Sequence, residues 1–443
     1  MAEDEGESGW AHLPDDLLLQ LLRRLASFAD RVRAAAVYRP WRSAASQLPP
    51  SRLPWVAFGN GTLLDLANDG APHPHHRRRL PDDCWRYSAG ENMLFLVHQR
   101  DGSCSLLNAL SGATTRLPEL AGLLRTYDVE HRHRERDDEL RRVPHNVPTH
   151  DMAYNLLRLG IPHNLLRHGI PRSSRRERDR DEPPMKAIGK VVVSSSASGG
   201  DDDPIVAVLL ERDIIVSTCR PAGESNSLLL GALRHDAVDM AVFQGKIYAL
   251  SKRSHALQTI DLSNGHRKGF KLKYSTELIE DQWLDNHHHQ DFHDDNIGVP
   301  TVEMYLLESG GKLLMVKRWL RGPWRPCIIP DADGRRTFRL EVWEADLRQG
   351  RWRWNKLDGG LDGRALFVSR PCSKSLPAGH GVRGDCIYFL NKLYQWKQPE
   401  APLGDSGVYS IRDKAFTPLL CDSEQSLPWK NGRFPSWFFH VQA

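Results

Sequence analysis

After Pro50 the same order of elements recurs along the chain, and this recurrence constrains the fold more than any other feature. Three stretches begin with a glycine-containing turn, continue as a short apolar run and are followed by a second such run. They cover residues 245–262, 311–347 and 384–411. A fourth hairpin is expected at 95–108, with Asp101-Gly102 as its turn. Repeated hairpins of this kind predict a mainly β domain built from several sheets.

Further strands are expected between these hairpins. Three largely apolar runs, at residues 190–193, 205–210 and 213–216, are typical of strands buried on both faces. Repeated small sheets favour a β-propeller, in which the sheets are arranged radially and few edges are exposed. The spacing between the hairpins is irregular, so a twisted β-sandwich is the alternative.

The first fifty residues predict three short helices instead. One apolar stripe with helical spacing contains six leucines: Leu13, Leu17, Leu18, Leu21, Leu22 and Leu25. Pro14 suits the first turn of the first helix, and Pro40 can open the last one. About forty residues in three helices cannot build a stable core alone. We therefore expect the stripe to contact another surface, in this chain or in a partner.

This segment resembles an F-box over roughly residues 10–50. The likeness lies in Leu-Pro-x-x-Leu-Leu at residues 13–18, the spaced leucines after it, and Val-x-Arg-x-Trp-Arg at 37–42. The resemblance implies docking to the adaptor subunit of an SCF-type (cullin-RING) ubiquitin ligase, and through it to cullin. The residues that match the adaptor-binding positions are Leu13, Pro14, Leu17, Leu18, Leu21, Leu25, Val37 and Trp41. The alternative is an amphipathic helical cap that packs on its own domain.

The remainder of the chain resembles the C-terminal kelch-like domain of unknown function that accompanies F-boxes in a large plant family. Segments 108–118, 261–265 and 363–369 carry this likeness. The implied fold class is α+β and multidomain: a small three-helix F-box at 10–50, then a mainly-β, propeller-like domain at 51–443. The resemblance indicates architecture and no particular ligand.

Composition argues against several other classes. Lys and Arg number 60 and Asp and Glu 56, so the net charge of +4 does not indicate a nucleic-acid partner. No segment approaches the ~20 apolar residues of a membrane helix, and the acidic residues 1–9, expected to be a disordered tail, are no signal peptide. The seven cysteines are scattered and lack a Cys-x-x-Cys pair, which is typical of free thiols. We expect a cytoplasmic or nuclear protein without a membrane partner.

Two polar insertions are expected to be disordered, at about 128–186 and 284–297. The first contains a near-duplication, residues 155–162 and 164–171, that is more typical of a tolerant linker than of a docking motif. The second contains a histidine-rich run at 287–293. It has the donor atoms for a metal but no framework that would hold them at fixed angles. We therefore expect no metal site and no cofactor.

Tryptophan and arginine alternate at Arg351, Trp352, Arg353 and Trp354. On a strand, the two rings share one face and the two guanidinium groups the other. Because Trp and Arg are enriched in binding hot spots, these residues are the candidate substrate-binding patch. The alternative is that the rings pack in the core while the arginines face water.

No motif for nucleophilic, metal-dependent or phosphoryl-transfer catalysis is present. The sequence therefore predicts a non-catalytic adaptor: the substrate-recognition subunit of an SCF-type ligase, whose β domain holds a target protein. One alternative is a scaffold or ligand-binding propeller whose F-box serves assembly or its own turnover. An enzyme with its active site in the central channel is a further alternative, for which no residues converge.

Overall fold

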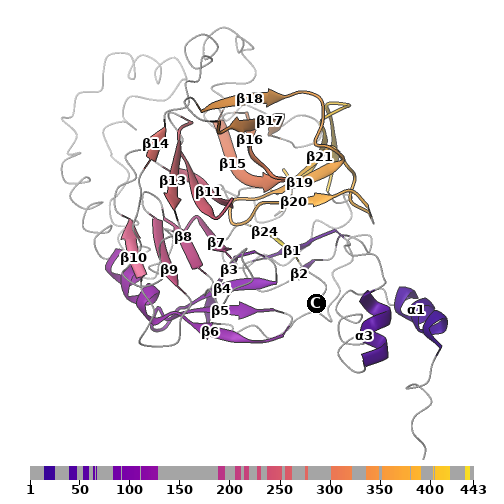
Figure 1. Ribbon diagram of the computed structural model, residues 1–443, viewed down its shortest axis with the longest axis horizontal. Helices are drawn as coiled ribbons and strands as arrows, with labels where there is room; N and C mark the ends of the chain where they lie inside the picture. The colour runs from indigo at the N-terminus through magenta and orange to yellow at the C-terminus, as the bar shows by residue number, and fades with distance from the viewer. Residues whose placement is uncertain are drawn as a thin grey trace, which may run out of the picture.

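The computed structural model describes residues 14–24, 39–46, 53–58, 63–64, 66, 83–90, 92–109, 111–127, 188–194, 205–210, 214–218, 227–230, 237–251, 255–261, 275–277, 301–321, 336–348, 352–379, 381–390, 403, 405–419 and 435–439. Helices α1 (Asp15–Arg24) and α3 (Arg39–Ser46) lie beside a set of sheets arranged around a common centre (Figure 1). Residues 118–127 are also helical. Within these ranges, no helix is long and apolar enough to span a membrane.

The strands in this part of the chain form six sheets. The first contains β1 (Trp55–Ala57), β2 (Leu63–Leu64) and β24 (Ser436–Phe438). The second contains β3 (Cys84–Ser88), β4 (Met93–His98), β5 (Cys104–Asn108) and β6 (Thr114–Arg116). The third contains β7 (Lys190–Ser194), β8 (Ile205–Leu209), β9 (Ile214–Thr218) and β10 (Ser227–Leu230).

The other three sheets follow in chain order. The fourth contains β11 (Ala237–Phe243), β12 (Lys246–Ser251), β13 (Leu257–Asp261) and β14 (Ser275–Glu277). The fifth contains β15 (Thr301–Ser309), β16 (Lys312–Leu320), β17 (Thr337–Asp346) and β18 (Arg353–Leu357). The sixth contains β19 (Arg364–Val368), β20 (Lys374–Pro377), β21 (Cys386–Phe389), β22 (Gly407–Ser410) and β23 (Ala415–Pro418).

Strands in the middle of these sheets are buried on both faces, which excludes the twisted β-sandwich. In β12, Ile247 and Ala249 belong to the apolar cluster shared with the third sheet, while Tyr248 and Leu250 belong to the cluster shared with the fifth. Successive residues of a strand point to opposite faces, so each face of this sheet packs against a different neighbour. In a two-sheet sandwich, only one face of a strand packs against another sheet.

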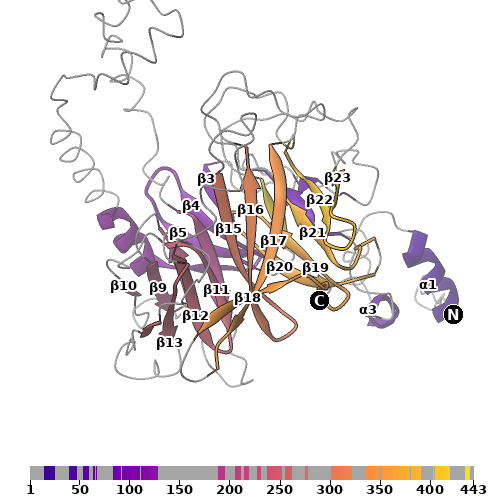
Figure 2. The same cartoon turned by 90° about the horizontal axis from the view of Figure 1, so that it is seen from above.

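Six apolar clusters join each sheet to the next and the last sheet back to the first. Leu96 and Phe438 lie in the cluster between the first and second sheets, and Phe367 and Val56 in the one between the sixth and first. The described sheets therefore form a closed ring, as in a β-propeller. Figure 2 shows the sheets after a 90° turn, with α1 and α3 to one side of them.

The ring closes through a sheet made from both ends of the β domain. Strand β1 pairs antiparallel with β24, and Val56 lies opposite Trp437. Strand β2 continues the sheet on the other side of β1. Because β24 belongs to the same sheet as β1, the ring is held shut by backbone hydrogen bonds as well as by side-chain packing.

The sixth sheet departs from a simple up-and-down order. Strand β19 pairs antiparallel with β20 and parallel with β21, so that β20 forms the sheet edge that contacts β15. Arg318 of β16 links the fifth and sixth sheets from a fully buried position. Its guanidinium donates to the Leu390 carbonyl at 2.8 Å and to the Asp405 carboxylate at 2.8 Å. A charged group that is excluded from solvent is costly unless hydrogen-bonding partners of this kind compensate for the lost water.

The described strands confirm the four expected hairpins and the three apolar strands. Strands β12–β13, β16–β17 and β21–β22 pair as the repeated pattern predicts, and β4–β5 turns at Asp101-Gly102. The structure adds elements that were not expected, among them β3, the helical residues 118–127 and the parallel pair β19–β21. The expected tail at 1–9 and the insertions at 128–186 and 284–297 lie outside the described residues.

Candidate functional site

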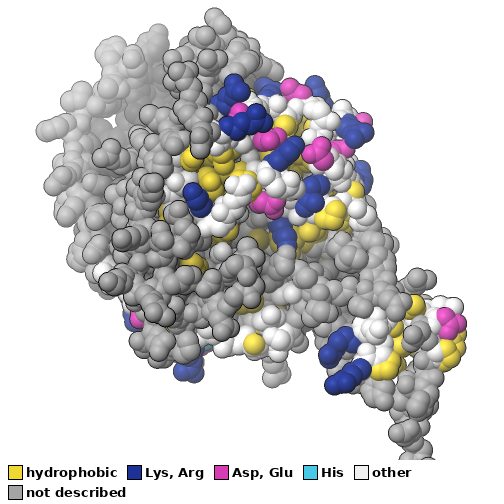
Figure 3. Space-filling view, in the orientation of Figure 1, with side chains coloured by type: hydrophobic (Ala, Val, Ile, Leu, Met, Phe, Trp, Pro, Cys, Tyr) yellow, Lys and Arg dark blue, Asp and Glu magenta, His cyan; other side chains and the backbone are white. Residues whose placement is uncertain are grey.

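The helix pair places one leucine at the surface and two in its interior. The first turn of α1 is closed by a 2.9 Å hydrogen bond from the Leu18 amide to the Pro14 carbonyl. Leu18 and Leu22, four residues apart, are fully buried, as is Ala44 of α3, which α1 contacts. Leu17, by contrast, is 47% exposed. Figure 3 shows apolar side chains at the surface of this helix pair.

The residues expected to bind an adaptor therefore divide into groups. Pro14 and Leu17 are exposed, and Leu21 and Trp41 are half-buried. Leu18 has no exposed surface in this conformation, so its side chain supports the helix pair from inside. Leu13, Leu25 and Val37 lie outside the described residues.

The expected substrate patch is split between an interface and the solvent. Trp352 and Trp354 are half-buried and pack on the cluster between the fourth and fifth sheets. The Trp354 indole Nε1 donates to the His255 carbonyl at 3.0 Å. Arg353 faces solvent, 3.4 Å from the Asp346 carboxylate, and Arg351 lies outside the described residues. The structure thus places the two rings against a sheet interface and Arg353 at the surface.

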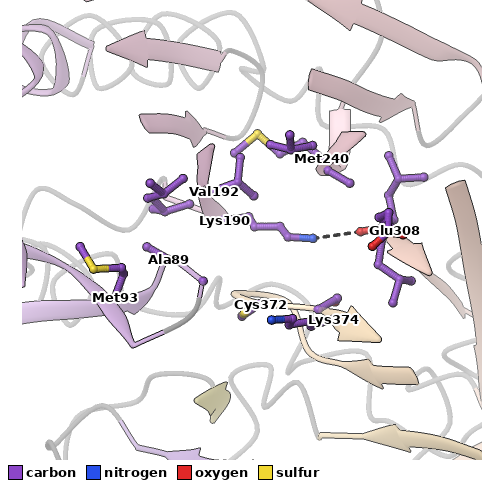
Figure 4. Close-up of a pocket in the computed structure, with 16 residues that line it drawn as sticks. Ala89, Met93, Lys190, Val192, Met240, Glu308, Cys372 and Lys374 are labelled. Carbon is purple, nitrogen blue, oxygen red and sulfur yellow. Dashed lines mark hydrogen bonds between the residues drawn. The ribbon is translucent and has the colours of Figure 1, made fainter. Parts of the chain in front are cut away.

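A cavity of about 470 Å³ lies where the inner edges of five sheets meet. Its walls are mainly apolar, with Met93 from the second sheet, Val192 from the third and Met240 from the fourth (Figure 4). Glu308 from the fifth sheet and Lys374 from the sixth add polar groups to the lining. Sequence reasoning did not identify these residues, because they converge only when the ring is closed.

A buried ion pair crosses the inner strands beside this cavity. Lys190 Nζ lies 2.7 Å from Asp239 Oδ1 and donates to the Leu306 carbonyl at 3.2 Å, the bond drawn in Figure 4. Asp239 accepts the Leu306 amide at 2.6 Å through its other oxygen. Burial raises the pKa of Asp239, an effect that Lys190 opposes. The pair thus joins strands β7, β11 and β15, and both its charges are satisfied by protein groups.

Lys374 is the second lysine of the cavity. Its ammonium lies 5.8 Å from the centre of the Phe439 ring. Burial lowers the pKa of Lys374 to about 8, because removing an ammonium group from water disfavours its charged form.

One group of metal-ligand side chains occurs in the described residues, on the second sheet. Asp83, Cys84 and His98 bring a carboxylate, a thiol and an imidazole within 4.8 Å of one another. Cys84 Sγ lies 2.9 Å from His98 Nδ1. Burial and, less strongly, the Asp83 carboxylate raise the pKa of the Cys84 thiol to about 11. Because β3 was not expected, the sequence did not indicate that Cys84 and His98 face each other. The histidine-rich run at 287–293 lies outside the described residues.

The cysteines that can be placed are Cys84, Cys104, Cys372 and Cys386, and all four are buried and free. Burial raises the pKa of Cys104 to about 12 and also raises those of Cys372 and Cys386. A thiol with a raised pKa carries little of the nucleophilic thiolate at neutral pH. These four cysteines therefore agree with the expectation of free thiols and do not indicate a thiol enzyme.

Comparison with known proteins agrees with this architecture. A family model described as KIB1-4 beta-propeller matches residues 64–410, and a model described as F-box-like matches residues 10–48. No curated protein matches the chain. A solved structure titled "YCF48 bound to D1 peptide" has 11% identity and a TM-score of 0.24, over 69% of this chain and 78% of that one. Likeness at this level supports no argument.

The propeller model spans most of the chain, and the described sheets form the ring that its description requires. Domains of these two kinds are typical of non-catalytic adaptor proteins. The chain therefore belongs to the KIB1-4 beta-propeller family and carries an F-box-like segment ahead of its propeller.

Proposed function

We propose that this protein is the substrate-recognition subunit of an SCF-type (cullin-RING) ubiquitin ligase. The F-box-like helices, within residues 10–50, bind the adaptor and through it cullin, and the β domain at 51–443 holds a target protein. The observation that carries the proposal is the pairing of an F-box-like segment with a propeller in one chain. The exposed Leu17, on a helix whose Leu18 and Leu22 are buried, supports it.

In this proposal the protein catalyses no step itself. It raises the effective concentration of the target near the conjugating enzyme. The adaptor interface uses the exposed Pro14 and Leu17 with the half-buried Leu21 and Trp41, together with Leu13, Leu25 and Val37. Leu18 acts from the interior of the helix pair. The Arg351–Trp354 segment contributes to target binding through its arginines, and the protein works in the cytoplasm or the nucleus.

The adaptor contact is tested by co-purification of the full chain with a ligase adaptor subunit. Burying a leucine side chain contributes about 1.5–3 kcal/mol, and 1.4 kcal/mol is a tenfold change in affinity. We expect Leu17→Asp to weaken adaptor binding by about 10- to 100-fold, because it places a charge in an apolar interface. Leu17→Met, which keeps an apolar side chain of similar size, is the matched control and should bind within a few-fold of wild type.

Equal adaptor recovery for wild type, Leu17→Asp and Leu17→Met would contradict the adaptor interface. Target recognition is tested separately, by blocking the proteasome and measuring the ubiquitinated proteins bound to the full chain. A receptor accumulates them in a manner that depends on Leu17, whereas a scaffold or ligand-binding propeller does not. Arg353→Glu should lower this accumulation without changing adaptor recovery if the arginine-containing segment contacts the target.

A further inference from the structure

The second sheet carries a three-residue cluster that the proposed function does not use. Asp83 immediately precedes β3, Cys84 begins β3 and His98 ends β4. We propose that Asp83, Cys84 and His98 bind one divalent metal ion of the zinc class through a carboxylate oxygen, a thiolate and an imidazole nitrogen. The remaining coordination position is left for water. These donor types are the ones that zinc selects.

The backbone holds the three residues in place before any metal arrives. Cys84 and His98 are directly opposite each other in the antiparallel pair β3–β4. The pairing extends one step further, because the Gln99 amide donates to the Asp83 carbonyl at 2.7 Å. His98 is also fixed from its other side, where its amide donates to the Ser103 carbonyl at 2.9 Å. Two strand pairings of one sheet therefore fix the backbone of the three residues. On binding, a metal ion would need to reorient only their side chains.

The distances between the three donor atoms fit one tetrahedral ion. Cys84 Sγ lies 2.9 Å from His98 Nδ1 and 3.7 Å from Asp83 Oδ1, and the latter lies 4.0 Å from Nδ1. Zinc binds sulfur, nitrogen and oxygen at about 2.0–2.3 Å, which sets the donors roughly 3.3–3.6 Å apart in tetrahedral geometry. Each edge of the triangle is thus within about 0.7 Å of its bound length, a change that side-chain rotation can supply.

The charges around the cluster are also suitable. Arg100 lies 3.9 Å from the Oδ2 atom of Asp83, whereas Oδ1 is the atom that faces Cys84 and His98. A cation on this side leaves Oδ1 free to face the metal position. On binding, the Cys84 thiol loses its proton to solvent, and a divalent ion then balances one thiolate and one carboxylate. Arg86 and Asp101 are two further charges that act on the Cys84 thiol, with opposite signs.

Solvent can reach the cluster. The side chains of His98 and Asp83 are 32% and 44% exposed, whereas Cys84 is buried behind them. A metal ion can therefore enter from the solvent side and find the sulfur at the base of the site. This arrangement differs from that of Cys104 on β5, which is equally buried and whose sulfur contacts the Gly102 carbonyl.

The test is a titration of the full chain, purified without metal, with Co²⁺ alone. Cobalt substitutes for zinc in such sites and gives a charge-transfer absorption only when a thiolate is bound to it. We expect one Co²⁺ per chain with that absorption, displaced by one equivalent of Zn²⁺. Cys84→Ser should remove the absorption, and Cys104→Ser, the matched control two strands away in the same sheet, should retain it.

A second variant keeps the test independent of folding. His98→Gln preserves the sulfur and a side chain of similar size, and should weaken Co²⁺ binding by at least about 100-fold, more than the loss of an outer-shell partner costs. Circular dichroism of each variant establishes that the propeller is folded. Binding of Co²⁺ without thiolate absorption, as the histidine-rich run at 287–293 would give, overturns the proposal. Absorption that survives in Cys84→Ser overturns it as well.

Discussion

Single polar side chains join the blades of this propeller at places that the sequence does not reveal. Lys190 opens an apolar run that was expected to be a buried strand, and the strand is there. Its partner Asp239 lies on the next sheet, and both contact Leu306 on the sheet after that. Local patterns predict a strand but not its neighbours around a ring. For that reason the strand was predictable and the ion pair was not.

Lys374 leads to a prediction about stability and pH. Burial lowers its pKa from 10.5 to about 8 in the folded protein. Between pH 8 and pH 10.5, therefore, the Lys374 amine is protonated in the unfolded chain and neutral in the folded one. The contribution of Lys374 to the free energy of unfolding therefore rises as the pH increases from about 8 toward 10.5, because the buried ammonium group loses its unfavourable charge. Lys374→Met removes this dependence. The variant should gain stability over wild type at pH 7 and lose that advantage near pH 10.

The comparison is made by chemical denaturation of both proteins at several pH values. Lys246→Met, at the exposed first residue of β12, serves as the control for replacing a lysine by methionine. A constant difference between Lys374→Met and wild type across this pH range would show that the Lys374 ammonium is not disfavoured by the fold.

At the level of strands and helices, four hairpins were predictable because each is encoded within a short stretch of sequence. The turn at Asp101-Gly102 sets β4 against β5 as expected, whereas β15, which the turn at residues 310–311 sets against β16, was not among the expected strands. The pairing of β1 with β24 has no local signal, since its two strands lie at opposite ends of the domain. Both are short, and only the geometry of the ring brings them together.

Strand β24 contributes the largest fully buried side chain of the described residues, Trp437. Trp437 is fully buried, donates from Nε1 to the Val368 carbonyl at 3.0 Å and meets the Phe367 ring edge-on at 5.2 Å. We expect Trp437→Ala to lower the free energy of unfolding by about 3–5 kcal/mol. Trp354→Ala, at a half-buried position on the outer strand β18, should cost less. Urea denaturation followed by circular dichroism measures both, and equal losses would mean that β24 does not hold the ring.

For the molecule as a whole, the sequence indicated the two kinds of architecture and their order along the chain. The Leu-Pro-x-x-Leu-Leu motif and the repeated hairpins are each contained in the sequence pattern, and the family matches at residues 10–48 and 64–410 agree with them. The stripe of leucines was a weaker guide to the interface, because helical spacing does not distinguish Leu17, at the surface, from Leu18, in the interior. That difference arises from the contact between α1 and α3.

The helix pair and the propeller should respond separately to mutation. None of the residues described in α1 or α3 belongs to the six clusters that join the sheets. We expect Leu18→Ala to destabilise the helix pair by about 2–5 kcal/mol and to speed hydrogen exchange of its amides. Exchange in β15 and β16 should be unchanged. Loss of protection in both regions would show that the helices and the ring unfold as one unit.

The pairing of β1 with β24 also sets the order in which the two parts of the protein become able to bind partners during synthesis. Translation at about 5–20 residues per second delivers β24 roughly 20–80 s after β1 has left the ribosome, since 436–438 are the last strand residues described and 55–57 the first of the ring. The helix pair lies ahead of β1 and needs none of the later residues for its own contact. A nascent chain can thus expose its leucine-bearing helices well before the propeller is complete and able to bind a second partner.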